Sequence, residues 1–216
     1  MQPDFLGIGP PRTGTTTLWA CLRLHPDIEI AERKELHWFS SPTWSLGQKR
    51  NYEKHWKTNL VKGEITPTYL NYIAKIVSTY PDIKLILTKR DPVDRFLSSI
   101  VLNYKINHRN NYSKNEFKNL VEDHLLNSIY FEPAEYDLQL GNYQKYVNQV
   151  DSNKLLVIDS EQLFKNQKDT LLEVFNFLGV RPFNIIPYHE ENIGDWTFDF
   201  SQDFINKLHI FYQNLK

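Results

Sequence analysis

Short apolar runs recur along the chain, and the segments between them place apolar residues at helical spacing. Three runs are compact, at residues 5–9, 84–88 and 154–159, and two weaker ones lie at residues 27–31 and 61–66. Strands that are buried on both faces show such continuous apolar runs, whereas half-exposed strands alternate. The pattern therefore predicts a three-layer α/β/α fold, in which helices cover both faces of a central parallel sheet of about five strands.

The segments between the runs predict helices with recognisable ends. Helices are expected over residues 15–22, 70–79 and 160–178. Ser160 is expected to be the N-cap of the last one, because its hydroxyl can accept a bond from the first turn. Gly179 ends that helix, since glycine adopts the left-handed conformation without a steric penalty.

A further helix follows the strand at residues 84–88. Asp91 and Pro92 fit an N-cap and a first helical residue, a position where the missing N–H of proline costs nothing. A helical block near residues 104–143 then interrupts the alternation of strands and helices. We interpret this block as an insertion into the α/β fold or a lid, which would carry specificity.

Length and composition narrow the class of protein. The chain has 216 residues, which at about 150 residues per domain predicts a single domain over residues 1–216. The net charge of −1 disfavours a strongly basic nucleic-acid binder, so no nucleic-acid partner is expected. A lone cysteine, Cys21, cannot form an internal disulfide, which favours a reducing compartment.

The chain also shows no targeting or membrane segment. No basic stretch followed by an apolar one opens the sequence, and no run reaches the roughly 18 apolar residues of a membrane helix. We therefore expect a cytoplasmic protein without a membrane span. The sequence leaves the oligomeric state open.

Glycine is scarce, and three of the eight glycines lie within eight positions near the start. Residues 9–16 read G-P-P-R-T-G-T-T between a predicted strand and a predicted helix. Phosphate-binding P-loops read G-x-x-x-x-G-K-[ST], and here Thr15 replaces the lysine. The free N–H groups of the helix and the charge of Arg12 still favour an anion. The alternative is an ordinary strand–helix connection in which threonines cap the helix and Arg12 is exposed.

Four motifs make the chain similar to the sulfotransferases that use 3′-phosphoadenosine 5′-phosphosulfate (PAPS). The P-R-T-G-T-T run resembles their 5′-phosphosulfate loop, P-[KR]-[SAT]-G-T-[TS], and R-D-P-V-D-R-F-L-S at 90–98 resembles R-[ND]-P-x-x-R-x-x-S. Residues 34–39, K-E-L-H-W-F, and 63–70, G-E-I-T-P-T-Y-L, are similar to segments of heparan-sulfate-type members. The resemblance covers about residues 5–180 and is closest to the heparan-sulfate-type and bacterial enzymes.

The resemblance implies a P-loop-like fold and in-line transfer of a sulfuryl group from PAPS to a hydroxyl or amine. The acceptor it implies is a saccharide or another small molecule, and the other product is 3′,5′-adenosine bisphosphate. Sulfate carries less charge than phosphate, so no metal is required. The residues that it places at the donor are Pro11, Arg12, Thr13, Gly14, Thr15 and Thr16 around the phosphosulfate, with Arg90 and Ser98 at the 3′-phosphate.

The resemblance also implies catalytic roles. Arg12 stabilises the charge that develops on the leaving oxygen. Glu35 is the first candidate for the base that accepts the acceptor proton, and His37 is the second. Glu64 is a third, because it ends a predicted strand at the edge where open α/β folds bind ligands. The alternative for Glu35 is a solvated glutamate beside Lys34, and a lone histidine such as His37 is more often a packed or capping residue.

Several questions stay open at this level. Adenine needs an apolar or aromatic partner, for which Trp38, Trp44 and Trp196 are candidates. Basic residues of the 104–143 block could receive an anionic acceptor or form a solvated face. Two other functions compete with sulfuryl transfer: a small-molecule P-loop kinase that uses Mg²⁺ and ATP, and a nucleotide-binding module without catalysis.

Overall fold

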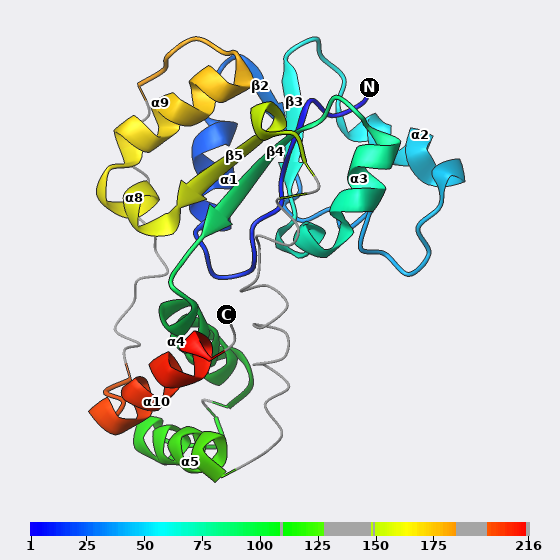
Figure 1. Ribbon diagram of the computed structural model, residues 1–216. Coiled ribbons are helices and arrows are strands. Elements are labelled where there is room, and N and C mark those ends of the chain that lie inside the picture. Colours follow the sequence, from blue (N-terminus) through cyan, green and yellow to red (C-terminus); the bar gives the residue numbers. More distant parts are fainter. Residues whose placement is uncertain (109, 128–147, 149, 185–197, 215–216) are drawn as a thin grey trace. The chain divides into compact units, whose positions relative to one another are not determined.

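A five-stranded parallel sheet forms the centre of the protein. The computed structural model describes residues 1–108, 110–127, 148, 150–184 and 198–214 (Figure 1). The strands stand in the order β2-β3-β1-β4-β5, which confirms the predicted sheet. Their bounds are β1 Phe5–Gly7, β2 Ile28–Ile30, β3 Val61–Ile65, β4 Lys84–Lys89 and β5 Leu155–Asp159.

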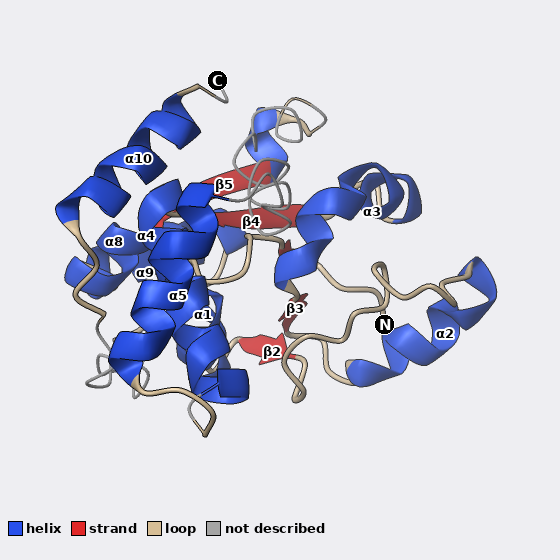
Figure 2. Ribbon diagram, turned by 90° about the horizontal axis from the view of Figure 1, so that it is seen from below, coloured by secondary structure: helices blue, strands red, loops and turns tan. Residues whose placement is uncertain are grey.

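Helices cover both faces of this sheet, as the pattern predicted. The helices α1 (Thr15–Arg23), α8 (Ser160–Lys165) and α9 (Gln167–Leu178) lie on one face, and α3 (Ile73–Thr79) lies on the other (Figures 1 and 2). A continuous core joins the first face to its helices. It contains Phe5, Ile65, Ile86 and Ile158 from the strands and Leu18, Leu22, Val174 and Phe175 from the helices. Each such side chain stabilises the fold by about 1.5–3 kcal/mol when it is fully buried.

The predicted helix over 70–79 begins differently in the structure. Residues Pro67–Tyr72 form a 3₁₀-helix, and the α-helix starts only at Ile73. Thr66 is extended, and its carbonyl accepts from the N–H of Tyr69 at 3.0 Å, the short i to i+3 bond of a tighter turn.

The predicted helix over 160–178 is two helices that meet at Asn166. The backbone of Asn166 leaves the helical region, with φ −125° and ψ 48°, and its carbonyl accepts from the N–H of Thr170, in the first turn of α9. The expected N-cap at Ser160 is also wrong. Asp159 is the cap, because it is still extended at the end of β5 and its carboxylate accepts from the N–H of Glu161 at 2.9 Å. Gly179 ends α9 at φ 80°, as expected.

A short helix, α2, lies between β2 and β3. It spans Lys49–Tyr52, and 3₁₀ turns at Leu46–Gln48 and Glu53–His55 flank it. A further 3₁₀ turn, Ser152–Lys154, leads into β5. The sequence pattern did not predict the helical stretch at residues 46–55.

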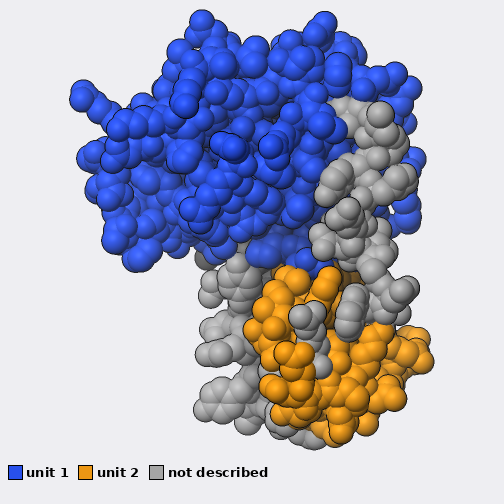
Figure 3. Space-filling model, turned by 180° about the vertical axis from the view of Figure 1, so that it is seen from behind, with its two compact units in different colours: residues 1–90, 143–189 blue, residues 91–142, 190–216 orange. Residues whose placement is uncertain are grey.

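The chain divides into two compact units (Figure 3). Unit 1 contains Met1–Arg90 and Tyr143–His189, and unit 2 contains Asp91–Asn142 and Glu190–Lys216. The sheet belongs to unit 1. The prediction of one domain stays a prediction, because division into units does not show whether either folds alone.

Unit 2 is helical. It contains α4 (Pro92–Asn103), a π-helical turn (Tyr104–His108), α5 (Lys114–Asn127) and the C-terminal α10 (Gln202–Gln213). Phe96, Phe117 and Phe204 share its core. The predicted insertion is therefore helical where the structure describes it, but the unit begins earlier, at α4, and includes a C-terminal helix. The rest of the predicted block, from residue 128, lies outside the described residues.

The predicted cap of α4 is present. The carboxylate of Asp91 accepts from the N–H groups of Val93 and Asp94 at 2.9 and 3.1 Å, and Pro92 is the first helical residue. Within the described ranges, no helix is both long and apolar enough to cross a bilayer. The location in the cell stays a prediction.

Candidate active site

The loop between β1 and α1 lies against the end of β4. A Cβ on Gly9 would be 2.1 Å from Oγ1 of Thr88 and 2.8 Å from its backbone nitrogen, so only glycine allows this approach. Thr13 is fully buried, and its hydroxyl donates to the carbonyl of Pro10 at 2.6 Å. The same hydroxyl lies 2.6 Å from Oγ1 of Thr88. Thr13 therefore ties the loop to β4 with its side chain, and only its backbone is left for the predicted donor contact.

Two residues of the loop adopt left-handed backbone conformations. Gly14 has φ 83° and Arg12 has φ 70°. A side chain rarely tolerates such an angle, and residues that do so cluster at functional sites. Backbone that alternates between right- and left-handed conformations turns successive N–H groups toward one side, which forms a concave anion site.

The first turn of α1 supports the same chemistry. The first helical bond runs from the N–H of Leu18 to the carbonyl of Gly14 at 3.0 Å. The N–H groups of Gly14, Thr15, Thr16 and Thr17 have no acceptor in the described part of the chain. No acidic residue lies in this turn, so the positive end of the helix dipole is not neutralised there. These donors fit a phosphate or sulfate group.

Arg90 meets this loop from the end of β4. Its Nη1 donates to the backbone carbonyl of Arg12 at 3.3 Å, so both arginines lie at the same edge of the sheet. Arg90 and Ser98 were predicted together at the 3′-phosphate. They belong to different units, Arg90 to unit 1 and Ser98, on α4, to unit 2, so their joint role stays a prediction.

Glu35 and His37 lie on the segment that follows β2. Glu35 has φ 64° and His37 has φ 57°, and the N–H of Glu35 donates to the carbonyl of Ile65 at 3.2 Å. One carboxylate oxygen of Glu35 forms an ion pair with Lys34. The other lies 3.4 Å from Nε2 of His37. The side chains of Glu35 and His37 are 35% and 45% exposed, so a substrate can reach both of the proposed bases. Their catalytic roles stay predictions.

Glu64, in contrast, is completely buried. Its Oε1 accepts from the hydroxyls of Tyr52 and Tyr69, both at 2.7 Å. Its Oε2 accepts from the hydroxyl of Thr66 at 2.7 Å and from the N–H of Leu36 at 3.1 Å. Burial raises the pKa of Glu64, and these four hydrogen bonds offset the rise only in part. A carboxylate so enclosed cannot reach an acceptor, so Glu64 is not the base.

The role of Glu64 is to hold the segment that carries the candidate bases. Leu36, whose N–H it binds, lies between Glu35 and His37. The hydroxyl of Tyr69 also accepts from the N–H of Trp38 at 2.8 Å, which fixes the next part of the segment. Sequence reasoning placed Glu64 at the sheet edge but missed these tyrosines, because partners of a buried carboxylate can come from anywhere along the chain.

The candidate partners of adenine have different surroundings. Trp38 is 8% exposed, and it stacks on Tyr52 with centroids 4.4 Å apart and planes 14° from parallel. This makes Trp38 a core residue. Trp44 is half-buried, and Nζ of Lys75 lies 4.6 Å from the centre of its ring. Trp196 lies outside the described residues.

Sequence comparisons agree with this geometry. Residues 45–184, more than half of the chain, match the pattern of the Sulfotransferase family. The chain is 27% identical over 208 residues to bifunctional heparan sulfate N-deacetylase/N-sulfotransferase 4 of Mus musculus. That match covers 83% of this chain and 22% of the mouse protein, so the chain spans about a fifth of that relative.

Solved structures share the fold. A sulfotransferase from Alicyclobacillus acidocaldarius superposes with a TM-score of 0.74 at 24% identity, covering 100% of this chain and 93% of that one. Mouse sulfotransferase SULT7A1, solved in complex with PAP, gives a TM-score of 0.60 at 13% identity, covering 100% and 84%. At these identities the structures show the fold, and the sequence match adds the family. The chain belongs to the sulfotransferase family.

Proposed function

We propose that the protein transfers a sulfuryl group from PAPS to a hydroxyl or amine of an acceptor, either a saccharide or another small molecule. The observation that carries the proposal is the hydrogen bond from Arg90 to the carbonyl of Arg12, in the loop that leads into α1. It brings together two candidate anion-binding elements, as a donor with phosphate groups on the 3′ and 5′ oxygens of one ribose requires. Membership of the family and the likeness to a structure solved with PAP support the same donor.

The loop supplies the groups that bind the phosphosulfate end. The unpaired N–H groups from Gly14 to Thr17 hold its oxygens, and the hydroxyl of Thr16, which is half-buried, lies in the same turn. Arg90 binds the 3′-phosphate, because a guanidinium can donate two parallel hydrogen bonds to a phosphate. Ser98 is proposed to add a hydroxyl there.

The reaction balances without a redox step. The acceptor oxygen forms a bond to sulfur while the bond from sulfur to the bridging oxygen breaks, and its electron pair stays on the 5′-phosphate. The acceptor proton passes to the carboxylate of Glu35 and then to solvent. Arg12 stays protonated, so it stabilises the leaving oxygen without donating a proton. An amine acceptor follows the same path.

Calorimetry separates this function from the kinase and from the inactive module. The protein is titrated with 3′,5′-adenosine bisphosphate, ATP and Mg-ATP, each with and without a chelator. Tight binding of the bisphosphate, unchanged by the chelator, is expected, and a preference for Mg-ATP would overturn the proposal in favour of a kinase. Transfer of ³⁵S-labelled sulfate from PAPS to a panel of saccharides, phenols and amines then tests catalysis. Binding without transfer to any acceptor would indicate the inactive module.

A further inference from the structure

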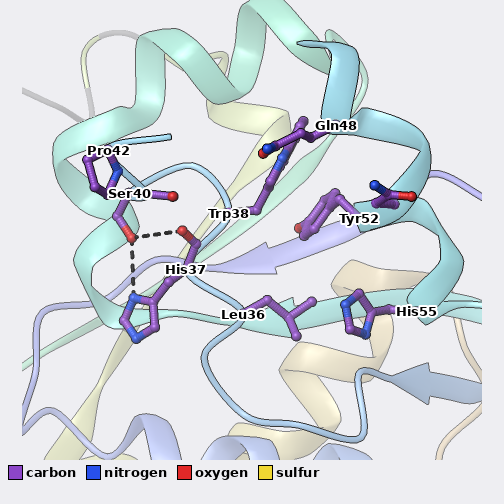
Figure 4. A pocket seen from close by; sticks show the side chains of 10 residues that line it. Leu36, His37, Trp38, Ser40, Pro42, Gln48, Tyr52 and His55 are labelled. Carbon is purple, nitrogen blue, oxygen red and sulfur yellow. Dashed lines mark hydrogen bonds between the residues drawn. The ribbon is translucent and has the colours of Figure 1, made fainter. Parts of the chain in front are cut away.

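A pocket lies beside His37, between the segment that follows β2 and the helical stretch around α2. Its volume is about 490 Å³, within the range of about 300–1,000 Å³ that is usual for small-molecule sites. Figure 4 shows His37 and Ser40 on one side of the pocket, Gln48, Tyr52 and His55 on the other, and Trp38 between the two sides.

The helical wall presents one face of residues 46–55 to the pocket. Gln48, Asn51, Tyr52 and His55 follow the i, i+3, i+4, i+7 spacing of a single helical face, and all four line the pocket. None of the four carries a permanent charge.

The charged residues of the same stretch lie elsewhere. Nζ of Lys49 is 4.5 Å from the centre of the Tyr80 ring and 3.8 Å from the carboxylate of Glu53. Arg50, Glu53 and Lys54 line a separate pocket near the N-terminus. The helical phase therefore leaves the pocket beside His37 without a lysine, arginine, aspartate or glutamate in its described lining.

The lining suits hydroxyl groups. Gln48 offers a side-chain amide that makes no hydrogen bond to any described residue, and Ser40 offers a hydroxyl 3.2 Å from Nδ1 of His37 (Figure 4). His55 adds an exposed imidazole. Amides, hydroxyls and neutral imidazoles both donate and accept, as sugar hydroxyls do. A sulfate or carboxylate placed here would lose water without gaining a lysine or arginine partner from the described lining, which is unfavourable.

His37 connects this pocket to the proposed base, because its Nε2 lies 3.4 Å from the carboxylate of Glu35. We propose that the pocket is the acceptor subsite and that it takes an uncharged sugar residue. The inference rests on the proposed function and narrows its acceptor. An uncharged acceptor would distinguish this chain from the relative that is named for heparan sulfate, because heparan sulfate is a polyanion.

The test compares the binding of two tetrasaccharides of equal length to the protein with 3′,5′-adenosine bisphosphate (PAP) bound. Tetra-N-acetylchitotetraose is neutral, and a heparosan tetrasaccharide replaces every second sugar with a glucuronate. We expect at least tenfold tighter binding of the neutral one. Equal or tighter binding of heparosan, or binding of neither while PAP binds normally, would overturn the inference. If PAP itself does not bind, the proposed function fails first, so the two failures are distinguishable.

Charge variants on the two faces of the helical stretch sharpen the test. Gln48→Lys places an ammonium in the pocket, so we expect it to weaken binding of the neutral tetrasaccharide about tenfold, to strengthen binding of heparosan, and to leave the Kd of PAP unchanged. Arg50→Gln, on the other face, is the matched control and should change neither tetrasaccharide. Equal effects of the two variants, or none from Gln48→Lys, would contradict the assignment.

Discussion

Two segments of the candidate site reach similar backbone strain by different means. The loop at residues 9–16 is shaped locally: Gly9 allows close approach, Gly14 adopts φ 83°, and the buried hydroxyl of Thr13 fastens the turn. The segment at residues 34–38 contains no glycine, although Glu35 and His37 also have positive φ. Contacts from other parts of the chain hold it in place. The conformation of the loop at residues 9–16 (the proposed donor loop) is therefore determined by its own residues. That of the segment at residues 34–38 (the base segment, which carries the proposed bases) depends on residues far away in the sequence.

The largest effect is expected at the loop, from Arg12→Ala. Removing the charge that stabilises the leaving oxygen should lower kcat by about 10³-fold. The Kd of 3′,5′-adenosine bisphosphate should change little, because the backbone N–H groups and Arg90 remain. Rates of ³⁵S transfer and calorimetry measure the two quantities. Arg33→Ala, at an exposed position, is the control, and an unaltered kcat in Arg12→Ala would refute the role of Arg12.

In the base segment, Glu35→Gln should lower kcat by about 10²-fold, because the amide cannot accept the proton of the acceptor. The Kd of the bisphosphate should stay the same, since the proposed partner of the carboxylate is the acceptor and not the donor. Glu32→Gln, also exposed and three residues earlier, controls for a general loss of negative charge. A larger loss in His37→Ala than in Glu35→Gln would assign the base to His37 instead.

Most of the fold, including the turn at residues 9–16, could be predicted because its determinants are local. A buried strand shows as an apolar run, and the caps at Asp91 and Gly179 depend on one residue each. One exception arose where two local solutions compete. At the end of β5, Asp159 and Ser160 can both cap a helix, and the carboxylate in extended backbone is the one that does so.

The base segment could be predicted only in part. Glu35 and His37 were found through the resemblance, but the geometry that exposes them could not be, because it depends on a buried carboxylate and two tyrosine hydroxyls. The pattern of apolar and polar positions gives no sign of the hydrogen bonds that Tyr52 and Tyr69 donate to Glu64. The packing of α10 against α4 was missed for the same reason, since contacts between distant segments leave no local pattern.

A smaller effect is expected from Arg90, whose side chain contacts the loop at residues 9–16. Arg90→Ala should raise the Kd of 3′,5′-adenosine bisphosphate by about tenfold or more, because a hydrogen bond to a charged group contributes about 1.5–3 kcal/mol. The Kd of adenosine 5′-phosphate, which lacks the 3′-phosphate, should not change. Lys89→Ala is the control at the neighbouring position. The ammonium of Lys89 lies 3.8 Å from the carboxylate of Asp159, so its removal should not change the Kd of either nucleotide. If both nucleotides weaken equally, the 3′-phosphate assignment is wrong.

The smallest effect is expected in how the free energy of unfolding depends on pH, where the carboxylates of Glu64 and Glu29 should act in opposite directions. Burial raises the pKa of Glu64. Glu29 is only slightly buried, and hydrogen bonds from Thr58 and Lys57 outweigh that burial and lower the pKa of Glu29. Where folding raises a pKa, the folded state binds more protons, so stability falls as pH rises through the folded value. Where folding lowers it, stability is lost as pH falls.

Chemical denaturation between pH 3 and pH 8 measures this contrast. The free energy of unfolding of the wild type relative to Glu64→Gln should fall as pH rises above the usual glutamate value. Relative to Glu29→Gln it should rise over the lower part of the range. The base segment depends on Glu64, so kcat should also decrease in Glu64→Gln while the Kd of the bisphosphate holds. A free-energy difference between the wild type and Glu64→Gln that rises with pH would show that folding does not raise the pKa of Glu64, and the long-range account of the base segment would fail with it.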